Sequence, residues 1–240
     1  MADDFSEFLS TRGPLPGQPL FGLTVLIVED SRFACEAMRL LCQRSGARLR
    51  RADCLRSARK HLATYRPAVV IIDLGLPDGA GEDLIAELAA SPARAPAVIG
   101  TSGDPDRAEA ALAAGAAAFL PKPIESLAAF QRTVLAALPE TLLSTTAVAA
   151  ATPAAAGADD AIAPDRVALR DDLALAVRLL DDAGPSDKAA LGYVSQFLRG
   201  VALSAHDEAL AKAATGQARL PQLRALVEDR LTGPATSGLV

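Results

Sequence analysis

An aspartate ends one of the most apolar stretches of the sequence and is followed at once by a glycine-rich loop. The stretch is VVIIDLGLPDGAG, residues 69–81, in which four aliphatic residues run into Asp73. A strand buried on both faces has no use for a carboxylate, so Asp73 either ends the strand without a further role or acts at its tip. Polar side chains also follow other apolar segments: Glu29 and Asp30 after TVLIV, Thr101 and Ser102 at the end of AVIGT, and Lys122 shortly after AAFL.

These residue types predict one kind of chemistry if the apolar segments are strands of one parallel sheet, whose carboxyl ends form a ligand-binding crevice. Three carboxylates in that crevice would repel one another strongly unless a cation lay among them. Mg²⁺ suits such a site because it binds one or two carboxylates together with phosphate and keeps several waters. A lysine and a hydroxyl would balance the charge of a phosphoryl group. We therefore expect metal-dependent phosphoryl transfer with Asp73 as the candidate nucleophile.

Each side chain also has a simpler interpretation. Glu29 and Asp30 could cap the helix that follows them, and Asp30 could cap as well as bind metal. Thr101 and Ser102 could be ordinary turn residues, and Lys122 could be a solvated surface lysine. The coincidence of all these residues at four strand ends favours a shared site.

The segments that would position these residues alternate between strand and helix from residue 23 to residue 138. Strand candidates are residues 24–28, 47–52, 68–72, 97–101 and 117–120, and helix candidates begin near Arg32, Leu55, Glu82, Pro105 and Ser126. Five such units predict an α/β fold, a doubly wound five-stranded parallel sheet with helices on both faces.

The remaining segments differ in composition. We predict an N-terminal extension at residues 1–22, an Ala/Pro-rich linker at 139–163, a small all-α domain at 164–232 and a flexible tail at 233–240. In the all-α domain, a helix from Pro164 would end at Gly184-Pro185, a second would be N-capped by Ser186, and two shorter ones would span about 205–214 and 221–231. The residues expected to face inward are Leu169, Leu173, Val177, Leu180, Leu191, Val194, Phe197, Leu198 and Val201.

Composition narrows the class of protein. The 240 residues are 50% hydrophobic and carry a formal net charge of −5, which does not suggest an anionic partner such as nucleic acid or a membrane surface. No segment approaches a membrane span, and the acidic N-terminus does not resemble a secretory signal. We expect Cys35, Cys42 and Cys54 to be reduced, which fits a cytoplasmic protein.

Four sequence pieces carry a family resemblance: LTVLIVEDS, VVIIDLGLPDGAGEDLI, VIGTSGD and AAGAAAFLPKPI. In this order and spacing, residues 23–138 resemble the receiver domain of bacterial two-component response regulators. The resemblance implies a flavodoxin-like sheet with strand order 2-1-3-4-5. It also implies a switch rather than a metabolic enzyme.

The resemblance further implies a role for individual residues. Asp73 would accept a phosphoryl group from a histidine kinase or a phosphotransfer protein. Mg²⁺ would be held by Glu29, Asp30, Asp73 and the backbone carbonyl of Gly75. The residues expected to bind the phosphoryl group or respond to it are Thr101, Lys122 and the aromatic Phe119, and Pro123 would follow a cis peptide bond.

Two departures from the family pattern concern the surroundings of Asp73. Gly75 and Gly103 lie two residues beyond Asp73 and Thr101, where family members often carry larger side chains. We hypothesise that these glycines leave the phosphoryl group open to water. The segment between Thr101 and Gly115 is about one residue short, so we expect its loop and helix to be reshaped.

The C-terminal part gives fewer signals. Residues 159–240 hold 12 acidic and 9 basic residues, a net charge of −3, without a helix-turn-helix pattern. We therefore expect a protein-interaction or dimerisation module, with DNA not the partner. The oligomeric state stays open, and the candidate homodimer surfaces are exposed apolar faces of the helical bundle and the face of the fourth and fifth helices of the receiver domain. The alternatives are a transcriptional regulator with an unrecognised DNA-binding element, and a phosphate sink.

Two further features have a simple and a functional interpretation. His206, on a predicted helix, is interpreted as an exposed helix residue rather than a phosphotransfer site, because Asp207-Glu208 follow it. The basic run from Arg44 to Arg66 is interpreted as a solvated face. The alternative is a docking surface for the acidic tail or for an acidic partner.

Overall fold

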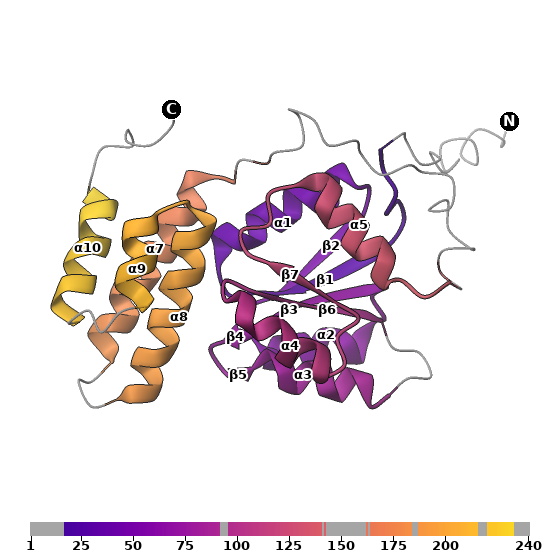
Figure 1. Cartoon of the computed structure of the whole chain (residues 1–240), viewed down its shortest axis with the longest axis horizontal. Coiled ribbons are helices and arrows are strands. Elements are labelled where there is room, and N and C mark those ends of the chain that lie inside the picture. Colours follow the sequence, from indigo (N-terminus) through magenta and orange to yellow (C-terminus); the bar gives the residue numbers. More distant parts are fainter. Residues whose placement is uncertain are drawn as a thin grey trace, which may run out of the picture.

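Two groups of secondary-structure elements make up the part of the chain that can be described (Figure 1). Our computed structural model describes residues 17–91, 96–140, 142, 162, 164–183, 187–215 and 220–232. We call the elements from β1 to α5 (residues 24–137) the α/β region and those from α7 to α10 (residues 166–232) the helical region.

The α/β region comprises β1 (Thr24–Val28), α1 (Arg32–Arg44), β2 (Arg48–Ala52), α2 (Leu55–Thr64), β3 (Val69–Asp73), β4 (Gly75–Leu76), β5 (Gly79–Ala80), α3 (Gly81–Ala89), β6 (Ala97–Ser102), the 3-10 turn η2 (Pro105–Arg107), α4 (Ala108–Ala113), β7 (Ala118–Pro121) and α5 (Leu127–Ala137). The helical region comprises α7 (Arg166–Asp182), α8 (Lys188–Ser204), α9 (Glu208–Thr215) and α10 (Leu220–Thr232).

Five parallel strands form the main sheet in the order β2-β1-β3-β6-β7. The two-residue strands β4 and β5 form a separate hairpin in the loop after β3, so β6 and β7 are the fourth and fifth strands of the main sheet. This confirms the predicted α/β fold with a doubly wound five-stranded parallel sheet in the order 2-1-3-4-5. Every residue of β3 is buried, as expected for a central strand covered on both faces.

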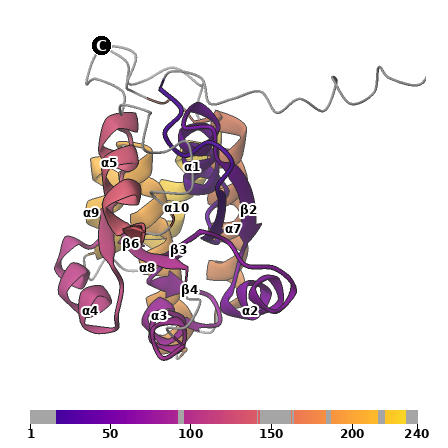
Figure 2. The same cartoon turned by 90° about the vertical axis from the view of Figure 1, so that its right-hand side faces the viewer.

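Helices cover both faces of the sheet (Figure 2). α1 and α5 lie on one face, where their apolar side chains pack with Val25, Ile27 and Ile71. α2, α3 and α4 lie on the other, where Leu26 and Val70 belong to a second cluster. Successive residues of one strand point to opposite faces, so the apolar run that predicts each strand also supplies both cores.

The loops at the carboxyl edge of the sheet are closed by local side-chain caps. Ser31 caps α1 by accepting a hydrogen bond from Ala34 N, and Ser126 caps α5 through Ala129 N. The simpler interpretation of Asp30 as the cap of the first helix is therefore wrong, because Ser31 takes that position. α4 has six residues and follows η2, and the expectation that this segment is reshaped relative to the family stays a prediction.

The helical region packs its own apolar cluster, centred on Leu173, Val194, Leu198, Val201 and Val227. The other residues predicted to face inward lie in or against this cluster, apart from Leu191, which is half-buried. α7 also contacts α1, and α8 contacts α1 and β4, so the helices lie against the carboxyl edge of the sheet (Figure 1).

Some expectations for the helical region are corrected. Asp187 caps α8 through Ala190 N, and the predicted cap Ser186 lies outside the described residues, as does Gly184-Pro185. His206 lies in the turn between α8 and α9 with a left-handed φ of 56°, so its placement on a helix was wrong.

Other expectations fall largely outside the described residues. These are the N-terminal extension up to residue 16, most of the linker, and the tail at 233–240. The predicted domain boundaries therefore stay predictions. Within the described residues, none of the helices is both long and apolar enough to cross a membrane.

Candidate functional site

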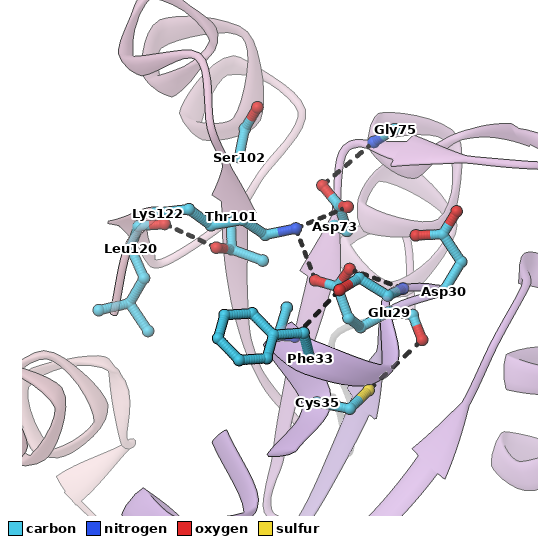
Figure 3. Close-up of polar contacts among 12 residues, drawn as sticks. Glu29, Asp30, Phe33, Cys35, Asp73, Gly75, Thr101, Ser102, Leu120 and Lys122 are labelled. Carbon is cyan, nitrogen blue, oxygen red and sulfur yellow. Dashed lines mark hydrogen bonds and ion pairs between the residues drawn. The ribbon is translucent and has the colours of Figure 1, made fainter. Parts of the chain in front are cut away.

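Five predicted site residues come together at the carboxyl edge of the sheet (Figure 3). Glu29 and Asp30 follow β1, Asp73 ends β3, Thr101 lies near the end of β6, and Lys122 directly follows β7. Because the strands are parallel and adjacent, their carboxyl ends meet at one edge, and this is what brings residues from four strands together.

Lys122 lies between two buried carboxylates. Its Nζ atom is 2.8 Å from Asp73 Oδ2 and 2.6 Å from Glu29 Oε2, and its side chain is only 5% exposed. Figure 3 shows the ammonium group pointing between the two acids. The interpretation of Lys122 as a solvated surface lysine is therefore wrong.

The charged groups of the site change one another's pKa values. Burial and the nearby Asp73 carboxylate raise the pKa of Asp30 to about 6. Burial also raises the pKa of Glu29 well above its usual range, and Lys122 only partly offsets this. Burial alone would lower the pKa of Lys122, but Asp73 and Glu29 together raise it above its ordinary value. The raised pKa values of the two acids indicate that one lysine does not offset the cost of burying three carboxylates together.

The donor set fits a hard divalent cation. Glu29, Asp30 and Asp73 each offer a carboxylate oxygen, and these oxygens lie within 4.8 Å of one another. Glu29 Oε2 is buried and, besides the ion pair with Lys122, makes no hydrogen bond of regular geometry. Crowded, desolvated carboxylate oxygens are the ligands and the electrostatic environment that Mg²⁺ requires.

The backbone around Asp73 is tightly packed. Its Oδ1 atom accepts a hydrogen bond from Gly75 N at 3.3 Å. A Cβ atom on Gly81 would lie 2.1 Å from the carbonyl oxygen of Asp73, closer than any real contact. Only glycine at position 81 therefore lets the loop return to the end of β3, which fixes where the Asp73 side chain starts.

The other predicted residues have different surroundings. Thr101 is buried, and its hydroxyl donates to the carbonyl oxygen of Leu120 at 2.7 Å. Phe119 is half-buried against the apolar cluster between the sheet and α2, α3 and α4. The peptide bond between Lys122 and Pro123 is cis, as the resemblance implied. The part of Phe119 in switching stays a prediction.

The helical region adds two side chains that sequence reasoning missed. The Tyr193 hydroxyl of α8 donates to Asp30 Oδ2 at 2.5 Å. Asp172 of α7 is 1% exposed and accepts hydrogen bonds from Ser31 Oγ, Arg32 N and Phe33 N, at the start of α1. One signal could have identified Asp172, because it lies three residues after Leu169 and four before Ala176, on the apolar face of its helix.

The space beside the two site glycines is occupied. A Cβ on Gly75 would lie 2.0 Å from Gln196 Nε2, and one on Gly103 would lie 3.0 Å from Leu203 Cδ1. In this structure α8 fills the room that larger side chains would take, and the hypothesis that these glycines leave a phosphoryl group open to water stays a prediction.

Comparison with known proteins identifies the α/β region. Residues 25–133 match the family model described as the response regulator receiver domain. This part of the chain is a response regulator receiver domain. The match agrees with the acidic strand-end site and the sheet order, and supports a role in a phosphorelay.

Curated relatives of the receiver domain include two named regulators. The KDP operon transcriptional regulatory protein KdpE of Escherichia coli is 36% identical over 99 residues, covering 41% of this chain and 44% of KdpE. The virulence transcriptional regulatory protein PhoP of Salmonella typhimurium is 33% identical over 103 residues, covering 42% and 46%. The chain thus spans less than half the length of these relatives.

Two solved structures are similar over about half of the chain. A response regulator receiver protein from Burkholderia phymatum is 32% identical, covers 48% of this chain and 94% of its own, and has a TM-score of 0.43. A CheY-like receiver domain from Methylobacillus flagellatus is 26% identical, covers 48% and 98%, and has a TM-score of 0.44.

Proposed function

We propose that this protein is a phosphorylated switch of a two-component phosphorelay, in which Asp73 of the receiver domain accepts the phosphoryl group. The observation that carries the proposal is the Asp73 carboxylate, paired with Lys122 inside a cluster of three acids at the carboxyl edge of the sheet. A carboxylate paired with a lysine in a dehydrated crevice is suited to attack phosphorus rather than to end a strand.

The transfer is a single displacement at phosphorus. A carboxylate oxygen of Asp73 forms the new O–P bond, and the P–N bond to the donor's histidine breaks. The departing imidazole takes up a proton, and the product is an acyl phosphate on Asp73. No oxidant or further reactant is required.

The surrounding residues would stabilise the charge that spreads over the phosphoryl oxygens. Lys122 is held by two carboxylates, so it can follow the negative charge from Asp73 to the phosphoryl group. Mg²⁺, bound by Glu29, Asp30, Asp73 and the Gly75 carbonyl, would neutralise oxygens of the donor and of the product. We propose that Thr101 turns its hydroxyl from Leu120 to the phosphoryl group.

The output would be the helical region. It contacts the receiver domain through residues that lie beside the site, which supports a coupling between phosphorylation and helix docking. We propose that phosphorylation changes the surface which this region offers to a protein target or to a second copy. In this proposal the protein is a cytoplasmic switch and not a metabolic enzyme.

Intact mass tests the proposal. The full chain is incubated with acetyl phosphate and Mg²⁺, and we expect the mass of one added phosphoryl group. The Asp73→Asn variant should gain none, and a chelator should prevent the gain in the wild type.

Asp83→Asn is the matched control, because Asp83 is an exposed aspartate of α3 outside the acidic cluster. It should be phosphorylated like the wild type. Equal phosphorylation of Asp73→Asn and wild type would overturn the assignment of the acceptor.

Regulation of transcription is a second candidate, favoured by the relatives KdpE and PhoP. KdpE and PhoP are transcriptional regulatory proteins, so the expectation that DNA is not a partner is not supported by them. Binding of the full chain to duplex DNA that weakens steeply with salt would favour this candidate. No binding at low salt would favour the protein-interaction module.

A further inference from the structure

Helix α8 covers the site described above. The remaining cavity has a volume of about 20 Å³ and is lined on one side by receiver residues and on the other by Gln196, Phe197, Gly200 and Val201 of α8. This is room for about one water molecule. A hydrated cation together with a phosphoryl group needs more space, so α8 has to move before both can bind.

Tyr193 makes the most specific contact between α8 and the acidic cluster. Its hydroxyl donates to Asp30 Oδ2, across 163 residues of sequence. Burial raises the pKa of Tyr193 above its ordinary value, as does the Asp30 carboxylate, so the hydroxyl keeps its proton and remains a donor. The hydrogen bond therefore occupies an oxygen of a proposed metal ligand.

Asp172 holds α7, the second helix that contacts the receiver domain, against the start of α1. The carboxylate accepts three hydrogen bonds of 2.7 to 2.9 Å, two of them from backbone N–H groups at the start of α1. A carboxylate at a helix N-terminus is stabilised both by these donors and by the helix dipole. The neighbouring Asp171 only forms an exposed ion pair with Arg32.

We propose that α7 and α8 form a lid on the receiver site, in which the Tyr193 hydroxyl and the divalent cation compete for Asp30. The proposal rests on the assignment of Asp30 to the metal site in the proposed function. Cation binding then favours the open arrangement, and the docked arrangement lowers the affinity for the cation. The cation and the Tyr193 hydroxyl therefore act in opposite directions on one equilibrium between the open and the docked arrangement.

The cation can reach this contact from solvent. An open cleft of about 630 Å³ runs between the receiver domain and α7, and both Asp30 and Tyr193 line it. The competition therefore needs no prior unfolding of either region.

The same hydrogen bond between Tyr193 and Asp30 could also have the opposite effect on metal binding. A tyrosine that hydrogen-bonds a metal ligand can orient that ligand and strengthen metal binding. Removal of the hydroxyl would then lower the affinity for the cation, whereas competition predicts a higher affinity.

The test is the Mg²⁺ affinity of the full-length Tyr193→Phe variant, measured by isothermal titration calorimetry. The variant keeps the ring that packs near Phe197 and loses only the hydroxyl. In the wild type this hydrogen bond to a charged group has to break before Mg²⁺ takes the oxygen, so we expect Mg²⁺ to bind the variant about tenfold more tightly than the wild type. Unchanged or weaker binding, or no Mg²⁺ binding by either protein, would overturn the proposal.

Tyr65→Phe is the matched control. Tyr65 is the second of the two tyrosines and its hydroxyl bonds His61 at the end of α2. This variant should bind Mg²⁺ like the wild type, and since the chain has no tryptophan, it leaves Tyr193 as the sole emitter. A hydrogen bond to a carboxylate quenches tyrosine fluorescence. The emission of Tyr193 should therefore rise when Mg²⁺ binds and this hydrogen bond breaks. Binding without any change in emission would contradict release of Tyr193.

The phosphorylation assay separates this proposal from the proposed function. If Tyr193→Phe binds Mg²⁺ more tightly but Asp73 gains no phosphoryl group, the competition stands and the acceptor assignment fails. If Asp73 is phosphorylated but Tyr193→Phe and the wild type bind Mg²⁺ equally, the competition fails and the acceptor assignment stands.

Discussion

The receiver domain and the helical region differ in where they bury polar groups. Among the described residues, the receiver domain buries Glu29, Asp73, Thr101 and Ser102 at the carboxyl edge of its sheet, and the nearly buried Lys122 joins them. The helical region has one buried charged side chain among its described residues, and it is Asp172, which faces the receiver domain. The rest of its described core is apolar.

This difference indicates a division of roles. Buried charges are costly, so they persist where function or a specific contact requires them. In the receiver domain they form the site, and in the helical region the buried charge forms the contact with that site. The helices therefore depend on apolar packing for their own stability and on Asp172 and Tyr193 for their position.

The largest change in the free energy of unfolding is expected from Lys122→Met. This change leaves the buried acids Glu29 and Asp73 without their cation, and removal of one partner from a buried ion pair costs about 3–5 kcal/mol. Urea unfolding without Mg²⁺ should show the loss. Lys60→Met on the exposed face of α2 should stay within about 0.5 kcal/mol of the wild type. A small effect at Lys122 would mean that the acids are not ionised together.

Truncation of a buried side chain should destabilise only the region that contains it. Leu198→Ala in α8 removes a fully buried side chain and should destabilise the helical region by about 2–5 kcal/mol. The fluorescence of Tyr193 reports this region and that of Tyr65 reports the receiver domain, so single-tyrosine versions follow each in urea.

The Tyr193 signal should change at lower urea, while the Tyr65 signal keeps its midpoint. Ile71→Ala in β3, also fully buried, should show the opposite pattern. Equal shifts of both probes in both variants would mean that the regions unfold as a single unit.

A smaller effect is expected at the contact between the regions. Asp172→Asn replaces a charged acceptor of three hydrogen bonds and should lower stability by about 1–3 kcal/mol. Asp171→Asn loses only an exposed ion pair and should change stability by less than about 1 kcal/mol. Thermal unfolding of both proteins checks the difference. A similar loss in the two variants would argue against Asp172 as the anchor of α7.

The smallest effect concerns the cysteines, all of which belong to the receiver domain. Burial raises the pKa of Cys42 to about 12, and burial together with the Glu29 carboxylate raises that of Cys35 still further. Thiols that stay protonated react slowly, so iodoacetamide should modify only the half-buried Cys54. The same pattern in Asp172→Asn would show that loosening the contact leaves the receiver fold intact, and labelling of Cys35 there would show that the fold opens.

The receiver fold could be predicted from sequence because its signals are local. Strands such as β3 are buried on both faces and therefore read as continuous apolar runs, and the start of each helix agrees with the prediction to within a few residues. The site followed from the same pattern, since the carboxyl ends of parallel strands meet at one edge.

The contact between the regions could not be predicted in this way. Tyr193 and Asp30 are far apart in the chain, and an apolar helix pattern says which residues face inward but not which surface the bundle covers. The same limit explains why the neighbour of Gly75 could not be predicted, because Gln196 comes from α8. His206 was misplaced because a left-handed turn residue leaves no periodic signal.

The central claim is that the docked helical region and phosphoryl chemistry at Asp73 exclude each other. A reversible tether tests it most directly. A Cβ on Gly103 would lie 3.5 Å from the Cα of Gly200 in α8, so the two positions lie side by side and we expect cysteines there to form a disulfide. The Gly103→Cys, Gly200→Cys protein, with Cys54→Ser to remove the reactive thiol, can therefore be locked by oxidation and released by reduction.

The measurement is the rate of phosphoryl gain from acetyl phosphate with Mg²⁺, by intact mass, in the oxidised and reduced forms of this one protein. The account predicts that the oxidised form, once its disulfide is verified by mass, gains the group at least about tenfold more slowly, and that reduction restores the rate. Equal rates in the two forms would contradict it.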